Sequence, residues 1–156
     1  MKIKKINTNK LVKNKKKKGE SMKEITKLMI DEYKIMEAGF DFMGYRVSEE
    51  KSLSYHHLIV PKRKHGKLTV ENGAILVRNT AHDYLHMIEK VHRKTFENIT
   101  REMIEENKKG HLDMINIEMI NEILLEFEEK YDDYTLRNGL YAIKDVYRKR
   151  LLNEKN

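Results

Sequence analysis

The chain has 156 residues, seven histidines, no cysteine and a formal net charge of +7. This length favours one domain with a modest core. The lack of cysteine excludes disulfides and thiolate metal sites, so any metal must be bound by histidine, carboxylate, water or substrate. No apolar run approaches the roughly 20 residues that span a bilayer. These features predict a cytoplasmic protein without a membrane-embedded segment.

The positive charge is concentrated at the N-terminus. Residues 1–18 contain nine lysines and no acid, and without them the net charge would be −2. We expect residues 1–20 to form a basic arm that ends near Gly19. Such a segment is typical of a disordered, solvated arm. An arm that contacts nucleic-acid phosphates without reading sequence is an equally good interpretation.

Residues 21–50 are predicted to form a helix and an apolar connector. Ser21–Glu24 has the form of a capping box, apolar residues follow with helical spacing, and Gly39 marks the end of the helix. The connector contains large apolar side chains, which we expect to pack in the core rather than to stack on bases. These side chains are Phe40, Phe42, Met43 and Tyr45.

Residues 51–110 contain the predicted central unit, which begins with two strands. Leu53–Val60 is rich in apolar and β-branched residues and stops at Pro61, which cannot donate a hydrogen bond to a neighbouring strand. Gly73–Arg78 is the second predicted strand, and a basic loop separates the two.

A helix is predicted to follow the second strand. Thr80 is expected to cap it. Apolar spacing predicts that it continues from about Ala81 past Lys90 through Ile104, and Lys108–Gly110 marks its end. His82 and His86 would project from one face of this helix about one turn apart. This is the spacing by which a helix presents two nitrogen ligands to one metal ion.

Two further histidines, His56 and His57, are adjacent on the first strand. Adjacent residues of a regular strand point to opposite faces, so both can serve one site only if the strand twists or ends there. The ordered set of His-His, Asn72 and then His-x-x-x-His resembles the HNH nucleases, the ββα-metal group, in the branch that includes the colicin DNases. The resemblance covers Tyr55–Lys90. It implies an α+β, mainly helical fold in which a short antiparallel hairpin and a helix are flanked by N-terminal and C-terminal helices.

The resemblance also implies a metal-dependent endonuclease that cleaves nucleic acid, with DNA favoured over RNA. Position by position, His57 matches the general base, and Asn72 matches the asparagine that braces the loop and keeps that base aimed. Asn79 is an alternative for the bracing role. The three positions that match metal ligands are His56, His82 and His86.

One divalent ion is implied at this site. Many relatives carry Asp where His56 stands, which leaves the metal open among Zn²⁺, Ni²⁺, Co²⁺, Mn²⁺ and Mg²⁺. A site with three nitrogen ligands favours the transition metals, since Mg²⁺ prefers oxygen. Glu89, three residues after His86, is expected either to orient a ligand histidine or to ligate the metal, and its default interpretation is an exposed glutamate.

Positive charge in and after the loop would attract a polyanion to such a site, although a solvated loop would look the same. The predicted nucleic-acid-binding residues are Lys62, Arg63, Lys64, Lys67 and Arg78.

Residues 111–156 are predicted to form a helical hairpin, with an acidic amphipathic helix up to Tyr131 and a basic one after Asp132–Asp133. The hairpin would cover the central unit within one compact domain or make a dimer contact. Two alternative functions remain open. One is a non-catalytic, metal-stabilised module that binds nucleic acid, and the other is a helical interaction protein with incidental histidines.

Overall fold

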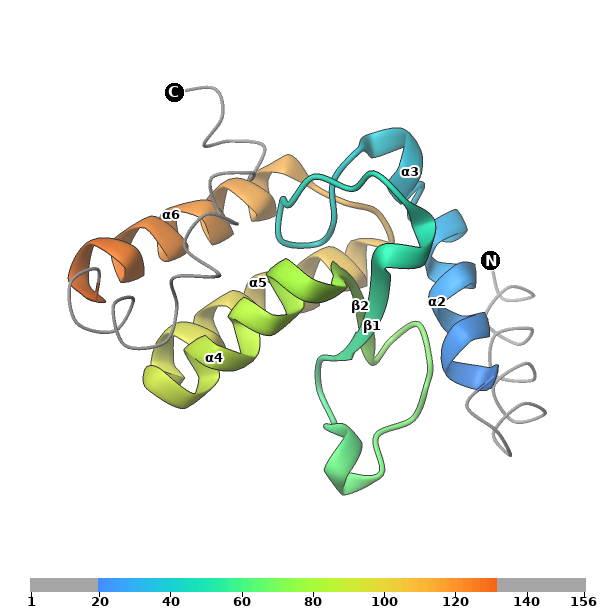
Figure 1. Cartoon of the computed structure of the whole chain (residues 1–156), viewed down its shortest axis with the longest axis horizontal. Helices are drawn as coiled ribbons and strands as arrows, with labels where there is room; N and C mark the ends of the chain where they lie inside the picture. Colours follow the sequence, from blue (N-terminus) through green and yellow to red (C-terminus); the bar gives the residue numbers. More distant parts are fainter. Residues whose placement is uncertain (1–19, 132–156) are drawn as a thin grey trace.

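The computed structural model describes residues 20–131. Its centre is an antiparallel hairpin that lies between two groups of helices (Figure 1). Strand β1 is Leu53–His57 and strand β2 is Gly73–Val77, and they pair from Leu53 opposite Val77 to His57 opposite Gly73. The α-helices in the described range are α2 (Glu20–Glu32), α3 (Ile35–Ala38), α4 (Asp83–Val91), α5 (Arg93–Lys109) and α6 (Met114–Tyr131). The predicted fold class, α+β and mainly helical, is confirmed.

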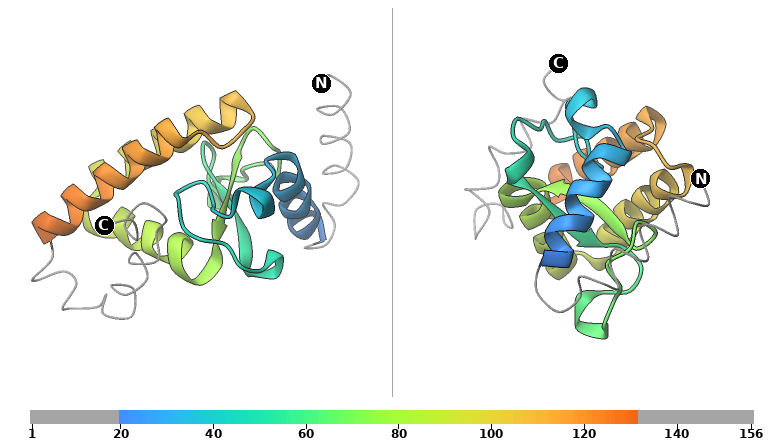
Figure 2. Two further views of the ribbon diagram at one scale, coloured as in Figure 1. Left: turned by 90° about the horizontal axis from the view of Figure 1, so that it is seen from above. Right: turned by 90° about the vertical axis from the view of Figure 1, so that its right-hand side faces the viewer.

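The hairpin separates two groups of helices. Helix α2 lies on one side of it, and α4, α5 and α6 lie on the other (Figure 1, Figure 2). Fully buried side chains from the strands and from both groups of helices form one core cluster. Within residues 20–131, no helix combines the length and the hydrophobicity that crossing a membrane requires.

The first strand is shorter than the sequence predicts. It ends at His57 rather than Val60 because the next backbone groups bond to Asn72 instead of continuing the ladder. The Leu58 N–H donates to the Asn72 carbonyl at 2.8 Å, and the N–H groups of Ile59 and Val60 donate to the Asn72 side chain. His57 therefore stands where the regular strand stops.

The second strand ends at a buried carboxylate to which the sequence analysis gave no role. Asp41, in the connector after α3, is fully buried. Its Oδ1 accepts the N–H groups of Met43 (2.8 Å) and Tyr45 (2.9 Å), and its Oδ2 accepts that of Val77 at 2.9 Å. Asp41 thus ties the connector to the end of β2. From there the chain enters a π-helical turn, Arg78–His82, that leads into α4.

The connector packs in the core as predicted. Phe42, Met43 and Tyr45 are at most 2% exposed, and Tyr33 of the preceding turn packs its ring against Phe42 with centroids 5.1 Å apart. Phe40 is half-buried. Core packing, rather than base stacking, is therefore the role of these aromatic side chains.

Replacing Asp41 with Asn is expected to flatten the pH dependence of folding stability. Burial raises the pKa of Asp41 to about 7, although backbone N–H donors act to lower it. Its unfolded pKa is lower, so the native state binds the extra proton, and stability falls as pH rises between the two values. Between pH 5 and pH 8 the wild type should lose roughly 2–3 kcal/mol more than Asp41→Asn. Urea unfolding of both proteins measures this difference, and parallel curves would contradict it.

The predicted single helix from about residue 81 ends at Lys109, before Gly110, as expected, but its continuity is wrong because the helix is interrupted at His92. This residue has an extended backbone (φ −150°, ψ 90°) and separates α4 from α5. Its Nδ1 accepts the Thr95 N–H at 3.3 Å, so the side chain caps α5. The break allows α5 to pack beside α4, and the buried faces of the two helices meet in the core.

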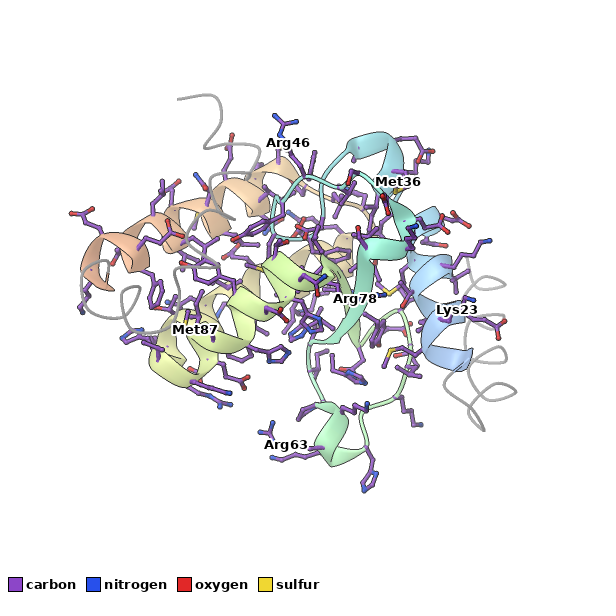
Figure 3. All side chains as sticks on the ribbon, in the orientation of Figure 1. Lys23, Met36, Arg46, Arg63, Arg78 and Met87 are labelled. Carbon is purple, nitrogen blue, oxygen red and sulfur yellow. The ribbon has the colours of Figure 1, made fainter. Side chains whose placement is uncertain are left out.

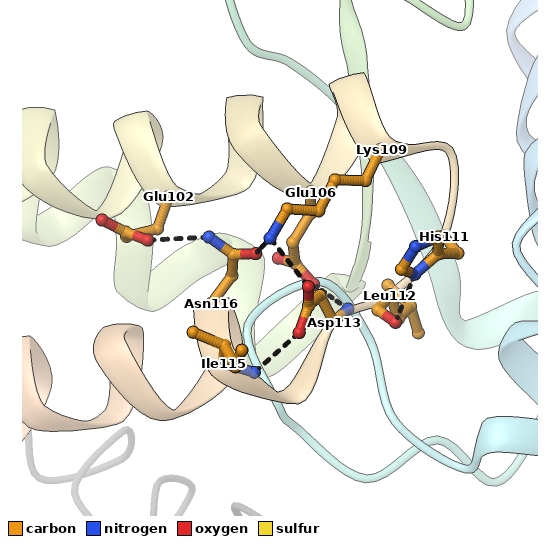
Figure 4. A network of polar contacts seen from close by, with 8 residues as sticks. All are labelled: Glu102, Glu106, Lys109, His111, Leu112, Asp113, Ile115 and Asn116. Carbon is orange, nitrogen blue, oxygen red and sulfur yellow. Dashed lines mark hydrogen bonds and ion pairs between the residues drawn. The ribbon is translucent and has the colours of Figure 1, made fainter.

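The turn between α5 and α6 is held by a network of polar side chains (Figure 4). Lys109 Nζ lies 2.7 Å from both Asp113 Oδ2 and Asn116 Oδ1. Asn116 in turn donates to Glu102 at 2.9 Å, while the buried Glu106 accepts the Asp113 N–H at 3.3 Å. These contacts fix the start of α6 against the end of α5.

Two sequence predictions concern residues that the structure leaves undescribed. The basic arm falls almost wholly within residues 1–19, and the second helix of the C-terminal hairpin falls within residues 132–156. The first helix of that hairpin is α6, which ends at Tyr131.

Candidate metal centre

Three histidines from three different elements converge beside the hairpin. His56 lies on β1, His82 at the end of the π-helical turn and His86 on α4. His56 Nδ1 is 3.2 Å from His82 Nε2, and His86 Nε2 is 3.1 Å from the same atom. One ligand atom from each ring lies within 4.8 Å of the other two. The three predicted ligands therefore form a cluster that can hold a metal ion.

Two of the three separations between the nitrogens suit a single ion. Nitrogen ligands about 2.1 Å from one ion are roughly 3.0–3.4 Å apart when the angles at the ion are between about 90° and 110°. The two short separations fall within this range. The cluster is also open on one side, since His56 is 4% exposed whereas the His86 side chain is 49% exposed. Water or substrate can therefore reach the remaining coordination positions.

The outer nitrogens of two rings have polar partners. His82 Nδ1 is 2.8 Å from Ser54 Oγ, and His86 Nδ1 is 3.2 Å from Glu89 Oε1. If each Nδ1 carries the proton and donates it to its partner, each Nε2 presents a lone pair to the cluster. Glu89 therefore lies where it can orient the His86 ring, which is one of its predicted roles. Ser54 was missed, although it stands two residues before His56 and so lies on the same face of the strand.

The electrostatics of the cluster favour neutral rings. Burial and the neighbouring histidines lower the pKa of His56 well below its usual value. Burial and then His86 lower the pKa of His82 to about 4. Neutral imidazole is the form that ligates a metal, so protons compete weakly for these two rings at neutral pH.

The fourth histidine, His57, shares a cleft of about 740 Å³ with the cluster. Its ring stands edge-on to the Tyr55 ring, with centroids 5.1 Å apart. Partial burial lowers the pKa of His57, a hydrogen bond to the Gly66 backbone acts to raise it, and Lys62 lowers it further. Adjacent residues of a regular strand point to opposite faces. Because the strand ends at His57, His56 and His57 can nevertheless line the same cleft.

The loop between the strands is held by the side chain of Asn72. Its Oδ1 accepts the N–H groups of Ile59 (2.9 Å) and Val60 (2.8 Å). Its Nδ2 donates to the carbonyls of Val60 (2.9 Å) and Lys67 (3.1 Å). The four bonds join the first part of the loop to its last part, which is the geometry expected of a bracing asparagine. Asn79, the alternative, is exposed in the π-helical turn.

Tyr55 makes a second connection within this loop. Its hydroxyl donates to the Thr69 carbonyl at 2.6 Å and accepts the Thr69 N–H at 3.2 Å. The ring passes so close to Gly73 that a Cβ there would lie 2.1 Å from a ring carbon. Glycine at this position is therefore required by close packing.

Replacing Asn72 with Ala is expected to destabilise the protein by on the order of 3–5 kcal/mol. The change removes four hydrogen bonds and leaves backbone groups of the loop without partners. Asn79→Ala removes the same side chain from an exposed position and should change stability by less than about 1 kcal/mol. Chemical denaturation of the two variants measures both effects. Equal losses would show that Asn72 does not hold the loop.

The structure separates the predicted nucleic-acid-binding residues. Lys62 and Arg63 line the histidine cleft, whereas Lys64 and Lys67 are exposed on the loop outside that lining. Arg78 lines a different cleft and donates to the Leu53 carbonyl at 3.1 Å. Figure 3 shows Arg63 at the tip of the loop and Arg78 beside β1. Of the five cations, Lys62 and Arg63 therefore line the cleft that contains the histidines.

A further histidine, His65, lies in the same loop. It adopts a left-handed backbone conformation (φ 62°) and lines the histidine cleft.

Comparison of the chain with models of known protein families, with curated proteins and with solved structures found no match. The residue pattern and the geometry of the site are therefore the basis for assigning a function.

Proposed function

We propose that this protein is a metal-dependent endonuclease that hydrolyses phosphodiester bonds in nucleic acid, with DNA favoured. One observation carries the proposal. Three histidines can hold one ion, and a fourth histidine outside that set lines the same cleft. A purely structural metal site would have no need of the fourth.

The proposed cofactor is one divalent ion held by His56, His82 and His86. Three nitrogen donors favour Zn²⁺, Ni²⁺, Co²⁺ or Mn²⁺ over Mg²⁺. When bound, the ion supplies positive charge that offsets the phosphate oxygens and stabilises the leaving oxygen.

His57 is the proposed general base. One of its ring nitrogens donates to the Gly66 carbonyl, and its lowered pKa keeps the ring neutral at pH 7. The other nitrogen is then able to accept a proton from the attacking water. The water oxygen bonds to phosphorus, the bond from phosphorus to the leaving alkoxide breaks, and the proton passes to His57. Asn72 supports this step by holding the loop to which Gly66 belongs.

Lys62 and Arg63 support a polyanionic substrate. Both line the cleft beside the four histidines. Positive charge at the mouth of a cleft raises the local concentration of an anionic substrate and its rate of association.

The test is a cleavage assay on full-length protein freed of metal by chelation. Zn²⁺, Ni²⁺, Co²⁺, Mn²⁺ and Mg²⁺ are restored one at a time, with plasmid DNA and a structured RNA as parallel substrates. Cleavage with one or more transition metals, and none with chelator, is the expected result. Salt-dependent binding without cleavage under any metal would reject the proposal and favour a non-catalytic module that binds nucleic acid.

A further inference from the structure

A second cleft, of about 710 Å³, lies between α2 and β1. It adjoins the histidine cleft, because His82, Tyr55 and Met22 line both. A molecule that occupies the histidine cleft can therefore extend into this second cleft without leaving the surface of the protein.

The second cleft is basic, and its lining includes one acid, Glu50. Arg78 is fixed at its edge by the bond to the Leu53 carbonyl. Lys51 lies 3.7 Å from Glu49, but both side chains are more than half exposed, so this ion pair contributes little. The cations that line the cleft are Lys23, Lys27, Lys51 and Arg78.

Two of these cations are lysines of α2. Lys23 and Lys27 are exposed and four residues apart, so they lie on the same face of the helix. Like charges at this spacing destabilise a helix by a few tenths of a kcal/mol. An anionic ligand between α2 and β1 would offset that repulsion. Helix α2 also follows directly on the lysine-rich residues 1–18 in the sequence.

We infer that the α2 cleft, which adjoins the histidine cleft, binds the backbone of the nucleic acid. Lys23, Lys27 and Arg78 contact its phosphates there. Lys62 and Arg63 contact the strand in the histidine cleft, so the substrate extends from one cleft into the other. The choice of ligand rests on the proposed function, since it takes the polyanion to be the substrate of the histidine site.

The chain contains no cysteine, so a single introduced thiol can be labelled without background. Lys27→Cys carries a photoactivatable crosslinker at the α2 cleft. Lys108→Cys is the matched control, because Lys108 is an exposed helical lysine that lines neither cleft. Full-length protein is irradiated in chelator with labelled DNA, both as a duplex and as a single strand. Crosslinking from residue 27 well above that from residue 108 is expected, and equal or absent crosslinking overturns the inference.

Salt dependence gives a second measurement. Each phosphate contact contributes about 0.7–0.9 to the slope of log K against log salt concentration. Lys23→Ala/Lys27→Ala should therefore reduce the slope by about 1.4–1.8. Arg101→Ala/Lys108→Ala removes the same charge from exposed sites outside both clefts and should leave the slope unchanged. Equal reductions in the two variants would overturn the inference.

Both measurements report binding in the absence of metal, so they do not depend on cleavage. An enzyme that cleaves but fails both tests would refute the α2 cleft and leave the proposed function standing. A protein that passes both tests but cleaves nothing would support binding at the α2 cleft and refute the proposed endonuclease function.

Discussion

Replacing His57 with Ala is expected to abolish nicking of plasmid DNA while the affinity for metal stays within a few-fold of the wild type. General base catalysis by a positioned side chain contributes about 10²–10⁴-fold to a rate, and this variant should lose that factor. Metal binding should persist because His57 is outside the cluster formed by His56, His82 and His86. Nicking kinetics and calorimetric metal titration measure the two quantities on the same preparation.

The control for this experiment is His111→Ala. His111 is exposed in the turn between α5 and α6, where its Nδ1 contacts the Leu112 carbonyl, and it lines neither cleft. The His111→Ala variant should cleave like the wild type. Undiminished cleavage by the His57→Ala variant would show that His57 is not the general base. Loss of metal binding together with cleavage would instead make His57 a ligand.

The sequence was most informative where the signals are local. A helical spacing of four residues placed His82 and His86 on one face, and the predicted second strand, Gly73–Arg78, differs from β2 by one residue. His56 lies beside His82 and His86 only because the hairpin brings β1 next to β2, which leads into the segment that carries those two histidines. Periodicity alone could not supply that arrangement, and the resemblance to a known pattern did.

The features that were missed depend on partners distant in the chain. Asp41 is a single acid in an apolar connector, and its role appears only when the Val77 N–H, 36 residues later, reaches it. Likewise, Ser54 meets His82 across 28 residues. The break at His92 was hidden because apolar spacing continues across it, so a pattern count does not detect the cap.

These cases show which parts of the site a sequence can predict. Residues that bind the proposed metal come as a recognisable set, because the ion demands particular side chains at particular spacings. Residues that hold the set in place can be any polar group within reach. Ser54, Asn72 and Asp41 all act in this way, and only Asn72 belonged to the recognised pattern.

Metal binding itself gives the second large expected effect, which is a gain in stability that His86→Ala removes. An ion that binds only the folded state stabilises it by about 2.7 kcal/mol when its free concentration is 100 times its dissociation constant. His86 is the ligand to replace because it is the most exposed of the three, so its removal costs little packing. Thermal unfolding with and without Zn²⁺ measures the gain, and His86→Ala should show almost none at the same concentration.

His111→Ala again serves as the control and should keep the full gain. An equal gain in His86→Ala would mean that the ion binds elsewhere, for example through exposed carboxylates, and the cluster would then lose its role. If none of the divalent ions stabilised any of the proteins, the proposed metal site would be refuted, together with the chemistry that depends on it. Stability and cleavage thus test separate steps of one argument, because a metal can bind and stabilise this fold whether or not His57 acts as a base.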